Sequence, residues 1–389
     1  MLLCPELLLL PLDGETIAFS ERTQRLFSLN PTAAVVVEKL QKGSGVSEVA
    51  QDLAARGLAP LERGMECVDA TLAALEEQLR VDEAVPARAE PDEISDVPPY
   101  TSFRPVTEQC YRLLETCALI RYGAWAQKRL VDSVLGHLAS DEPCAPTLVI
   151  ELKAEKRANY TMRSDVYRDG VPIASARGLS FLAPIVKAAI WQTAVSAHDF
   201  FFYIHAGVVG NGTSCLLLPA AAGSGKSSLT MALVHRGFQY FSDEVALIEP
   251  GTFHVLPMPL AMAIKESGWD LMGRYYPALE SLPIHIRKDA KVLRYLPPPM
   301  NAVAQAPSAV RHVIFPHYQP GVQTKLVPLR RAEALGRLMH QCLGLRRRLD
   351  ADNVRAIAAW MTSIDCYELT HSSLEAAVDA IVGAAGFRQ

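Results

Sequence analysis

The first 82 residues predict a small unit of strands followed by helices. Two short apolar-rich runs, residues 7–11 and 16–19, predict strands, and the Asp13-Gly14 pair between them favours a hairpin turn. A third strand is predicted over 25–29. Asn30 before Pro31 is typical of a helix start, and apolar residues spaced by threes and fours then predict three helices up to residue 81. The pattern is that of a winged-helix-like α+β module.

The composition then changes. Residues 83–106 are acidic and rich in proline, which favours an extended linker. Further on, the pattern predicts a helix over 108–138, short strands at 149–152, 159–162 and 166–167, a helix over 183–197 and a β-rich run at 201–209. We interpret residues 107–199 as an N-terminal extension of the sheet that follows.

The remaining chain, 200–389, alternates strands with helices and predicts an α/β domain. A buried strand is predicted over 310–316, and helices over 332–343, 351–363 and 373–384.

The stretch from 205 to 249 has the layout of a phosphate-binding loop. An apolar strand enters a glycine-rich turn, and Lys226 and Ser227 then open a helix. Backbone N–H groups at a helix N-terminus attract anions. Lys226 is expected to contact the β- and γ-phosphates of ATP, and the Ser227 hydroxyl to bind Mg²⁺. The predicted nucleotide-binding residues are Gly223, Ser224, Gly225, Lys226, Ser227 and Ser228.

The loop departs from the pattern GxxxxGK[ST] at its first glycine, which is Ala220. An alanine does not adopt φ > 0 at low cost. We therefore expect the loop to begin differently or to bind nucleotide less tightly.

Two adjacent carboxylates, Asp243 and Glu244, follow a strand predicted over 238–241. Sheets of α/β proteins place ligand sites at such strand ends. Neighbouring side chains on an extended backbone point opposite ways, so we expect different roles. One would hold Mg²⁺, directly or through water, and the other would accept the proton of an attacking hydroxyl. His205, at the end of an apolar strand, is a third candidate, although a hydrogen-bonded structural histidine fits that position equally well.

Composition narrows the class of protein. The formal net charge is −4 and the basic residues are scattered, which argues against a nucleic-acid partner. Eight cysteines without a metal-binding spacing predict thiols in a reducing compartment. No segment approaches the roughly 20 apolar residues of a membrane span, and the leucine-rich start lacks the basic region of an export signal. We expect a cytoplasmic protein without a membrane partner.

Two resemblances sharpen these expectations. Residues 27–34, Phe-Ser-Leu-Asn-Pro-Thr-Ala-Ala, followed by a helix, a glycine break and a short amphipathic helix, resemble the PqqD family. That resemblance implies a domain that grips the leader segment of a precursor peptide, which adds as an edge strand. The alternative is a packing or dimerisation domain, so a homo-oligomer stays open.

The second resemblance is to the HPr kinase/phosphorylase family. His205, the run 223–227, Arg236-Gly237 and Asp243-Glu244 occur in that family's order and spacing. The resemblance implies a P-loop kinase domain that uses ATP and Mg²⁺ to phosphorylate a serine hydroxyl. It implies Lys226 on the phosphates, Ser227 and Asp243 at the metal, Glu244 in place of the catalytic aspartate, and His205 beside the acceptor hydroxyl. Besides Ala220 and Glu244, residues 263–268 depart from the family's Glu-Arg-Gly segment.

Together the resemblances predict a kinase that phosphorylates a Ser or Thr of a precursor peptide in ribosomal peptide natural product biosynthesis. Residues 1–82 would hold the peptide and raise the effective concentration of the acceptor. Two alternatives stay open: a kinase of a small molecule such as free serine, and a nucleotide-gated peptide chaperone without catalysis.

Overall fold

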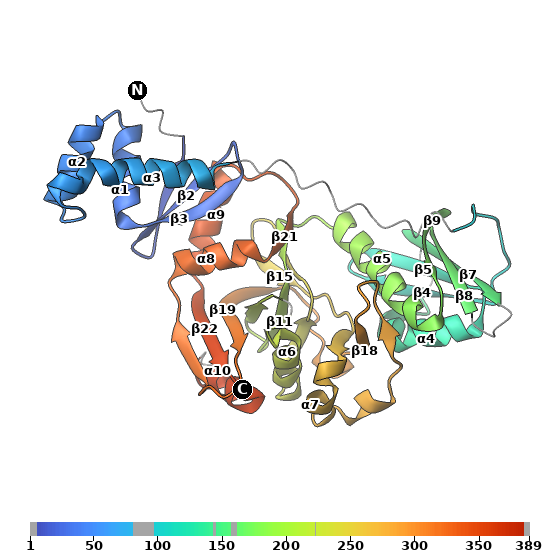
Figure 1. Cartoon of the computed structure of the whole chain (residues 1–389). Coiled ribbons are helices and arrows are strands. Elements are labelled where there is room, and N and C mark those ends of the chain that lie inside the picture. Colours follow the sequence, from blue (N-terminus) through green and yellow to red (C-terminus); the bar gives the residue numbers. More distant parts are fainter. Residues whose placement is uncertain (1–5, 81–96, 143–144, 157–161, 222, 385–389) are drawn as a thin grey trace.

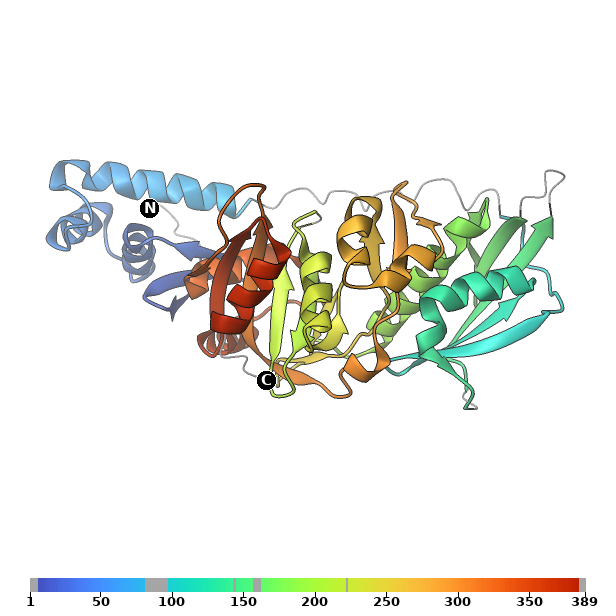
Figure 2. The same cartoon turned by 90° about the horizontal axis from the view of Figure 1, so that it is seen from below.

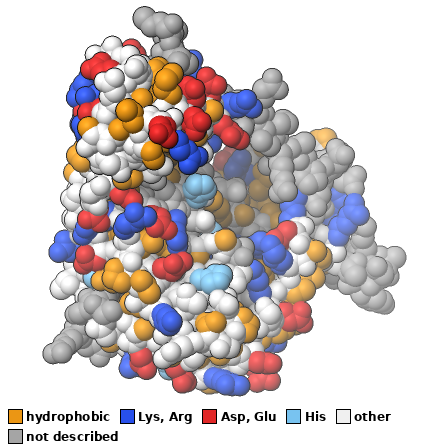
Figure 3. All heavy atoms as spheres, turned by 60° about the vertical axis from the view of Figure 1, so that its left-hand side comes forward, with side chains coloured by type: hydrophobic (Ala, Val, Ile, Leu, Met, Phe, Trp, Pro, Cys, Tyr) orange, Lys and Arg blue, Asp and Glu red, His pale blue; other side chains and the backbone are white. Residues whose placement is uncertain are grey.

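The computed structural model describes residues 6–80, 97–142, 145–156, 162–221 and 223–384. Within these residues the protein is a mixed α/β structure with four sheets and ten α-helices. Figures 1 and 2 show three parts in a row: a small N-terminal unit, a large central sheet, and a second sheet at the other end. Over the face drawn in Figure 3, basic and acidic side chains are interspersed.

The N-terminal unit has the strands and helices that the pattern predicts. They are β1 (Leu8–Leu12), β2 (Glu15–Ser20), β3 (Arg25–Leu29), α1 (Pro31–Gln41), α2 (Val46–Ala55) and α3 (Gly64–Gln78), with a 3₁₀ turn over Leu61–Arg63 before α3. Asp13 and Gly14 both have positive φ, as the predicted hairpin turn requires. The Asn30 side chain accepts a hydrogen bond from the Ala33 N–H at 2.8 Å and so caps α1.

This unit is packed firmly against the central part of the molecule. Leu12, Ile17 and Phe19 belong to the same buried cluster as residues of the central sheet and of helices α8 (Arg331–His340) and α9 (Ala351–Thr362). The amide of Gln24 also exchanges two hydrogen bonds with the backbone of Leu349, at 3.0 and 2.7 Å. The contact therefore combines apolar burial with specific hydrogen bonds.

A second sheet follows, in the order β6-β4-β5-β7-β8-β9. Its elements are β4 (Thr107–Leu113), β5 (Thr116–Tyr122), α4 (Trp125–Leu135), β6 (Ala139–Ser140), β7 (Leu148–Lys156), β8 (Met162–Arg168), β9 (Val171–Ala176) and α5 (Leu182–Ala197). The strands form a sheet of their own and do not extend the ten-stranded sheet. The predicted strand over 159–162 lies outside the described residues except for Met162.

The predicted helix over 108–138 is wrong for its first half, which is the β4–β5 hairpin. The hairpin turns at Leu114-Glu115, and Leu114 has φ 52°, a conformation that leucine rarely adopts. No Gly, Asn or Pro marks this turn in the sequence. Tyr111 and Leu113 on one strand, and Ile120 and Tyr122 on the other, are buried with the period of two that a half-buried strand requires.

The described end of the predicted linker is ordered against this sheet. The Tyr100 hydroxyl donates to Glu151 Oε1 at 3.0 Å, and the Tyr167 hydroxyl donates to the Pro98 carbonyl at 3.0 Å. Residues 97–106 therefore pack on β7 and β8, whereas residues 81–96 lie outside the described chain.

The central sheet has ten strands, in the order β13-β11-β12-β19-β15-β14-β10-β21, with β22 beside β19 and β20 beside β22. Its elements are β10 (Phe202–Ile204), β11 (Ala206–Gly210), β12 (Cys215–Pro219), α6 (Lys226–His235), β13 (Gln239–Ser242), β14 (Ala246–Ile248), β15 (His254–Leu256), β19 (Ser308–Tyr318), β20 (Lys325–Pro328), β21 (Cys342–Leu345), β22 (Asp365–His371) and α10 (Leu374–Ala384). A small sheet lies beside it (Figure 1) and consists of β16 (Met262–Lys265), β17 (His285–Ile286) and β18 (Val292–Leu296). Helix α7 (Trp269–Gly273) lies between β16 and β17 in the sequence.

The parallel pairs β12–β19 and β19–β22 place three strand carboxyl ends at one edge of the central sheet. This edge carries the glycine-rich loop after β12. The predicted helix over 332–343 ends earlier, at His340, because the chain continues as strand β21.

One helix in the described part of the chain, Leu179–Ala197, is long and apolar enough to cross a membrane, contrary to the expectation from sequence. Half of its most apolar stretch is buried within the protein. Its Val186 and Ile190 belong to a core that also contains Val245 and Leu247 of the central sheet region. The helix therefore joins the second sheet to the central one.

The cysteines are not all free thiols, contrary to the expectation from the sequence. The free cysteines among the described residues are Cys67, Cys110, Cys215, Cys342 and Cys366. Cys117, however, is disulfide-bonded. This bond does not fit a chain whose cysteines are all reduced.

Candidate functional site

The glycine-rich loop leaves β12 and turns into α6 with two glycines in the left-handed region. Gly223 has φ 94°, and Gly225, the N-cap of α6, has φ 85°. Both positions therefore favour glycine. Ala220 is buried but is not among the residues with positive φ, so the alanine introduces no backbone strain of that kind.

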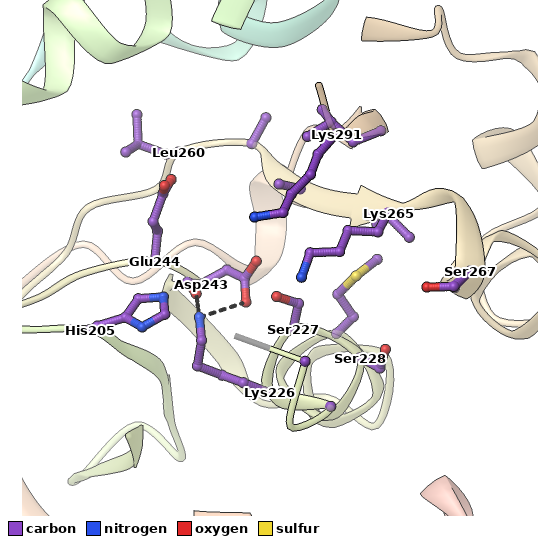
Figure 4. A pocket seen from close by; sticks show the side chains of 18 of the residues that line it. His205, Lys226, Ser227, Ser228, Asp243, Glu244, Leu260, Lys265, Ser267 and Lys291 are labelled. Carbon is purple, nitrogen blue, oxygen red and sulfur yellow. Dashed lines mark hydrogen bonds and ion pairs between the residues drawn. The ribbon is translucent and has the colours of Figure 1, made fainter. Parts of the chain in front are cut away.

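A pocket of about 310 Å³ opens at the N-terminus of α6. It gathers the predicted site residues except Ser224, whose hydroxyl donates to the Ala221 carbonyl at 2.8 Å within the loop. The predicted residues that line it are His205, Gly223, Gly225, Lys226, Ser227, Ser228, Asp243 and Glu244. Figure 4 shows Lys226 between His205 and Asp243, and Ser227 facing the same space. Residues up to 39 positions apart in the sequence are thus brought together.

Lys226 and Asp243 form the buried floor of this pocket. The Lys226 ammonium donates to the Asp243 backbone carbonyl and lies 3.9 Å from its Oδ1 atom. Burial raises the pKa of the Asp243 carboxyl, while Lys226 and a hydrogen bond with Ser227 act to lower it. Oδ1 is buried without a hydrogen-bond partner. An orphaned carboxylate oxygen beside a serine hydroxyl is a suitable pair of ligands for a divalent cation.

No group of three or more His, Cys, Asp or Glu in the described part of the chain could hold a metal ion. Asp243 and Ser227 would therefore share a cation with oxygen ligands from water or phosphate. That arrangement is usual for Mg²⁺, which keeps several waters and binds through one or two protein carboxylates and substrate phosphates.

Figure 4 shows the Glu244 and Asp243 side chains pointing in different directions. The two residues lie in the bend between β13 and β14, not on the extended backbone expected from the sequence. The Oε2 atom of Glu244 lies 2.5 Å from the Nζ atom of Lys187, a buried residue of α5. Lys187 is the main cause of a Glu244 pKa that is lowered to about 2. The two adjacent carboxyls therefore have pKa values shifted in opposite directions, and opposite shifts favour different chemical roles.

His205 lies between β10 and β11, and its backbone N–H donates to the Gln341 carbonyl at 2.8 Å. Burial, followed by the charge of Lys226, lowers the pKa of the imidazole. The ring is therefore neutral near pH 7 and can accept a hydrogen bond in the pocket.

Three further cations line the pocket from the small sheet: Lys265, Arg287 and Lys291. Figure 4 shows Lys265 and Lys291 extending toward the carboxylates. Arg287 and Lys291 each pair with Asp289 at 2.6 Å. Basic side chains thus outnumber acidic ones around the pocket, which suits an anionic ligand.

Lys187 is the site residue that the pattern of the sequence did not single out. It is the only charged residue in α5, and its partner is 57 positions away. A lone charge within an apolar helix is the signal that could have identified it, because such a charge needs a partner when the helix is buried.

A second pocket, of about 480 Å³, lies on the N-terminal unit between β3 and α3. Within the described residues β3 is an edge strand of its sheet, with no strand paired to its outer backbone groups. The lining comprises Phe27, Ser28, Leu29, Asn30, Ala33, Ala70, Thr71, Ala74, Leu75 and Gln78. We call this pocket the β3–α3 groove.

Comparison of the whole chain with protein-family models and with curated proteins gives no match.

Proposed function

We propose that the protein is an ATP- and Mg²⁺-dependent kinase that phosphorylates a Ser or Thr hydroxyl of a precursor peptide in ribosomal peptide natural product biosynthesis. In this proposal the central part is an HPr-kinase-like P-loop domain and the N-terminal unit is PqqD-like. The observation that carries the proposal is the pocket at the N-terminus of α6. It joins Lys226, Ser227 and two differently tuned carboxylates around one space.

Each group in the pocket has a suitable chemical role. Lys226 and the N–H groups of the first turn of α6 would bind the β- and γ-phosphates. Ser227 and Asp243 would hold Mg²⁺, which neutralises phosphate charge when bound. The neutral imidazole of His205 would face the acceptor hydroxyl, and one of the two carboxylates would orient it and accept its proton.

The β3–α3 groove supports a peptide as the acceptor. An extended segment could add to the free edge of β3 by main-chain hydrogen bonds, while side chains enter the space in front of α3. Binding there would raise the concentration of the acceptor residue near the loop. The kinase pocket would then need little affinity of its own for the peptide.

The test is phosphoryl transfer by the full chain. The protein is incubated with ATP, Mg²⁺ and the peptides encoded by reading frames beside its gene, and products are analysed by mass spectrometry. A mass gain of one phosphate, lost in Lys226→Met and kept in Lys325→Met, supports the kinase. Lys325 is an exposed lysine on β20, outside the pocket. No phosphopeptide from any of these peptides would count against the proposal.

The excess of basic side chains around the pocket favours one alternative, a kinase of a small anionic alcohol such as free serine. Lys265, Arg287 and Lys291 could bind its carboxylate. Phosphorylation of free serine that added peptides do not inhibit would favour this alternative. ATP binding without transfer to either acceptor would instead favour a nucleotide-gated peptide chaperone.

A further inference from the structure

Lys187 is buried in the middle of an apolar helix, with only 4% of its surface exposed. Its ammonium lies 2.5 Å from Glu244 Oε2 and 5.3 Å from the centre of the Tyr295 ring. A buried ammonium requires an anion, because the protein interior does not replace its hydration. Although burial opposes the charged form, Glu244 and Tyr295 outweigh it and the Lys187 pKa is raised. Lys187 and Glu244 therefore form an ion pair.

The pair connects two parts of the molecule that have separate sheets. Lys187 belongs to α5, which follows the six-stranded sheet, whereas Glu244 follows β13 of the central sheet. Near the pair in the sequence, Val186 and Ile190 of α5 share a hydrophobic core with Val245 and Leu247. This core fixes α5 relative to the strand end that carries Glu244. The ammonium therefore meets the carboxylate at a set position.

We propose that Lys187 is a positioning residue that holds the Glu244 carboxylate in the pocket, so that the unit of residues 97–197 completes the site built on the phosphate-binding loop. The catalytic consequence rests on the proposed kinase function, whereas the positioning itself does not. It gives the second sheet a role in the site. Without Lys187, the Glu244 side chain would be free to change its conformation.

The activity test compares Lys187→Met and Lys187→Arg in the full chain. The matched control is Lys128→Met, which removes another lysine of the same unit, a half-buried one on α4 that is paired at 2.5 Å with Asp132. We expect Lys187→Met to lower kcat at least 30-fold and to change the Kd of ATP less than threefold, because the phosphate contacts lie on α6.

Lys187→Arg should retain the charge and recover kcat to within about fivefold, and Lys128→Met should resemble the wild type. A kcat of Lys187→Met that stays within about twofold of the wild type would overturn the proposal. An equal loss in Lys128→Met would also overturn it, because the effect would then be a general one.

A second readout does not depend on activity. The Tm is measured for Lys187→Met, Glu244→Gln and the double variant. If the two side chains are coupled, the double variant should regain at least half of the Tm lost by Glu244→Gln, because it no longer contains the buried Lys187 ammonium without its partner. Additive losses would overturn the positioning role. If the wild-type protein transfers no phosphoryl group, the kinase function is refuted. The Tm comparison then still tests whether Lys187 positions Glu244.

Discussion

A methyl group on Gly207 would overlap the hydroxyl of Thr230, because α6 packs directly against β11 at this point. Gly207→Ala should push α6 away from the sheet and lower the free energy of unfolding by about 1–3 kcal/mol. Because the helix begins at the loop, nucleotide binding should weaken as well. Urea unfolding and ATP titration measure the two effects. The control is Gly336→Ala in α8, where an added methyl meets nothing within 4 Å. A Gly207→Ala protein as stable as this control would contradict the close packing.

The left-handed conformation of Gly225 gives a second prediction. Gly225→Ala and Gly212→Ala both place a side chain at positive φ, 85° and 91°, and should each cost about 1–2 kcal/mol of stability. Gly212 lies in the turn between β11 and β12, at the other end of these strands. Only Gly225→Ala should therefore weaken ATP binding, by roughly tenfold or more. Equal affinities in the two variants would show that the loop does not bind the phosphates.

The orphaned oxygen of Asp243 predicts a dependence on Mg²⁺. Asp243→Asn should abolish the extra thermal stabilisation that Mg²⁺ adds to ATP, and raise the apparent Kd of the Mg²⁺ complex at least tenfold. Without ligand the variant should be as stable as the wild type or more so, because burial disfavours the Asp243 charge. The control Asp379→Asn changes a surface aspartate paired with Arg236. If Asp243→Asn retains the Mg²⁺ effect, Asp243 is not a ligand of the metal.

Acid should weaken the protein partly through Glu244. Its pKa is lowered in the folded state to about 2 from an ordinary 4.5, so its stabilising contribution is present above pH 4.5 and is lost as the pH falls toward 2. The urea midpoint of the wild type should therefore exceed that of Glu244→Gln at pH 6, and the difference should shrink by pH 3. A difference that does not change with pH would contradict the ion pair with Lys187.

The β3–α3 groove can be tested with two neighbouring alanines of α3. Ala74 lines the groove, whereas Ala73 is exposed and does not. Ala74→Arg should fill the groove and weaken binding of a precursor peptide by about tenfold or more, and Ala73→Arg should bind normally. Fluorescence anisotropy with labelled peptides from neighbouring reading frames measures both. Equal binding by the two variants would place the peptide elsewhere.

Local signals in the sequence predicted what depends on a few consecutive residues. The Asp13-Gly14 turn and the Asn30 cap each follow from the backbone conformation that one residue type favours. The grouping of His205, Lys226 and Asp243 was also predictable, because neighbouring strands end at one edge of a sheet.

What escaped prediction depends on distant contacts. The β4–β5 hairpin has a leucine at positive φ in its turn, so only pairing and burial of its strands determine it. The partner of Lys187 follows from how α5 packs on the central sheet, and apolar periodicity does not specify which helix meets which strand. The β21 strand likewise formed where a helix was expected, because it pairs with β10.

The apolar contact between the N-terminal unit and helices α8 and α9 affects how the protein can be dissected. Leu12, Ile17 and Phe19 cover a surface that includes Leu335 and Ile357. Deleting residues 1–82 would expose this surface to water and favour aggregation. A shortened chain that lost activity would not distinguish loss of peptide capture from misfolding. Point substitutions in the β3–α3 groove, which leave this contact intact, separate the two causes.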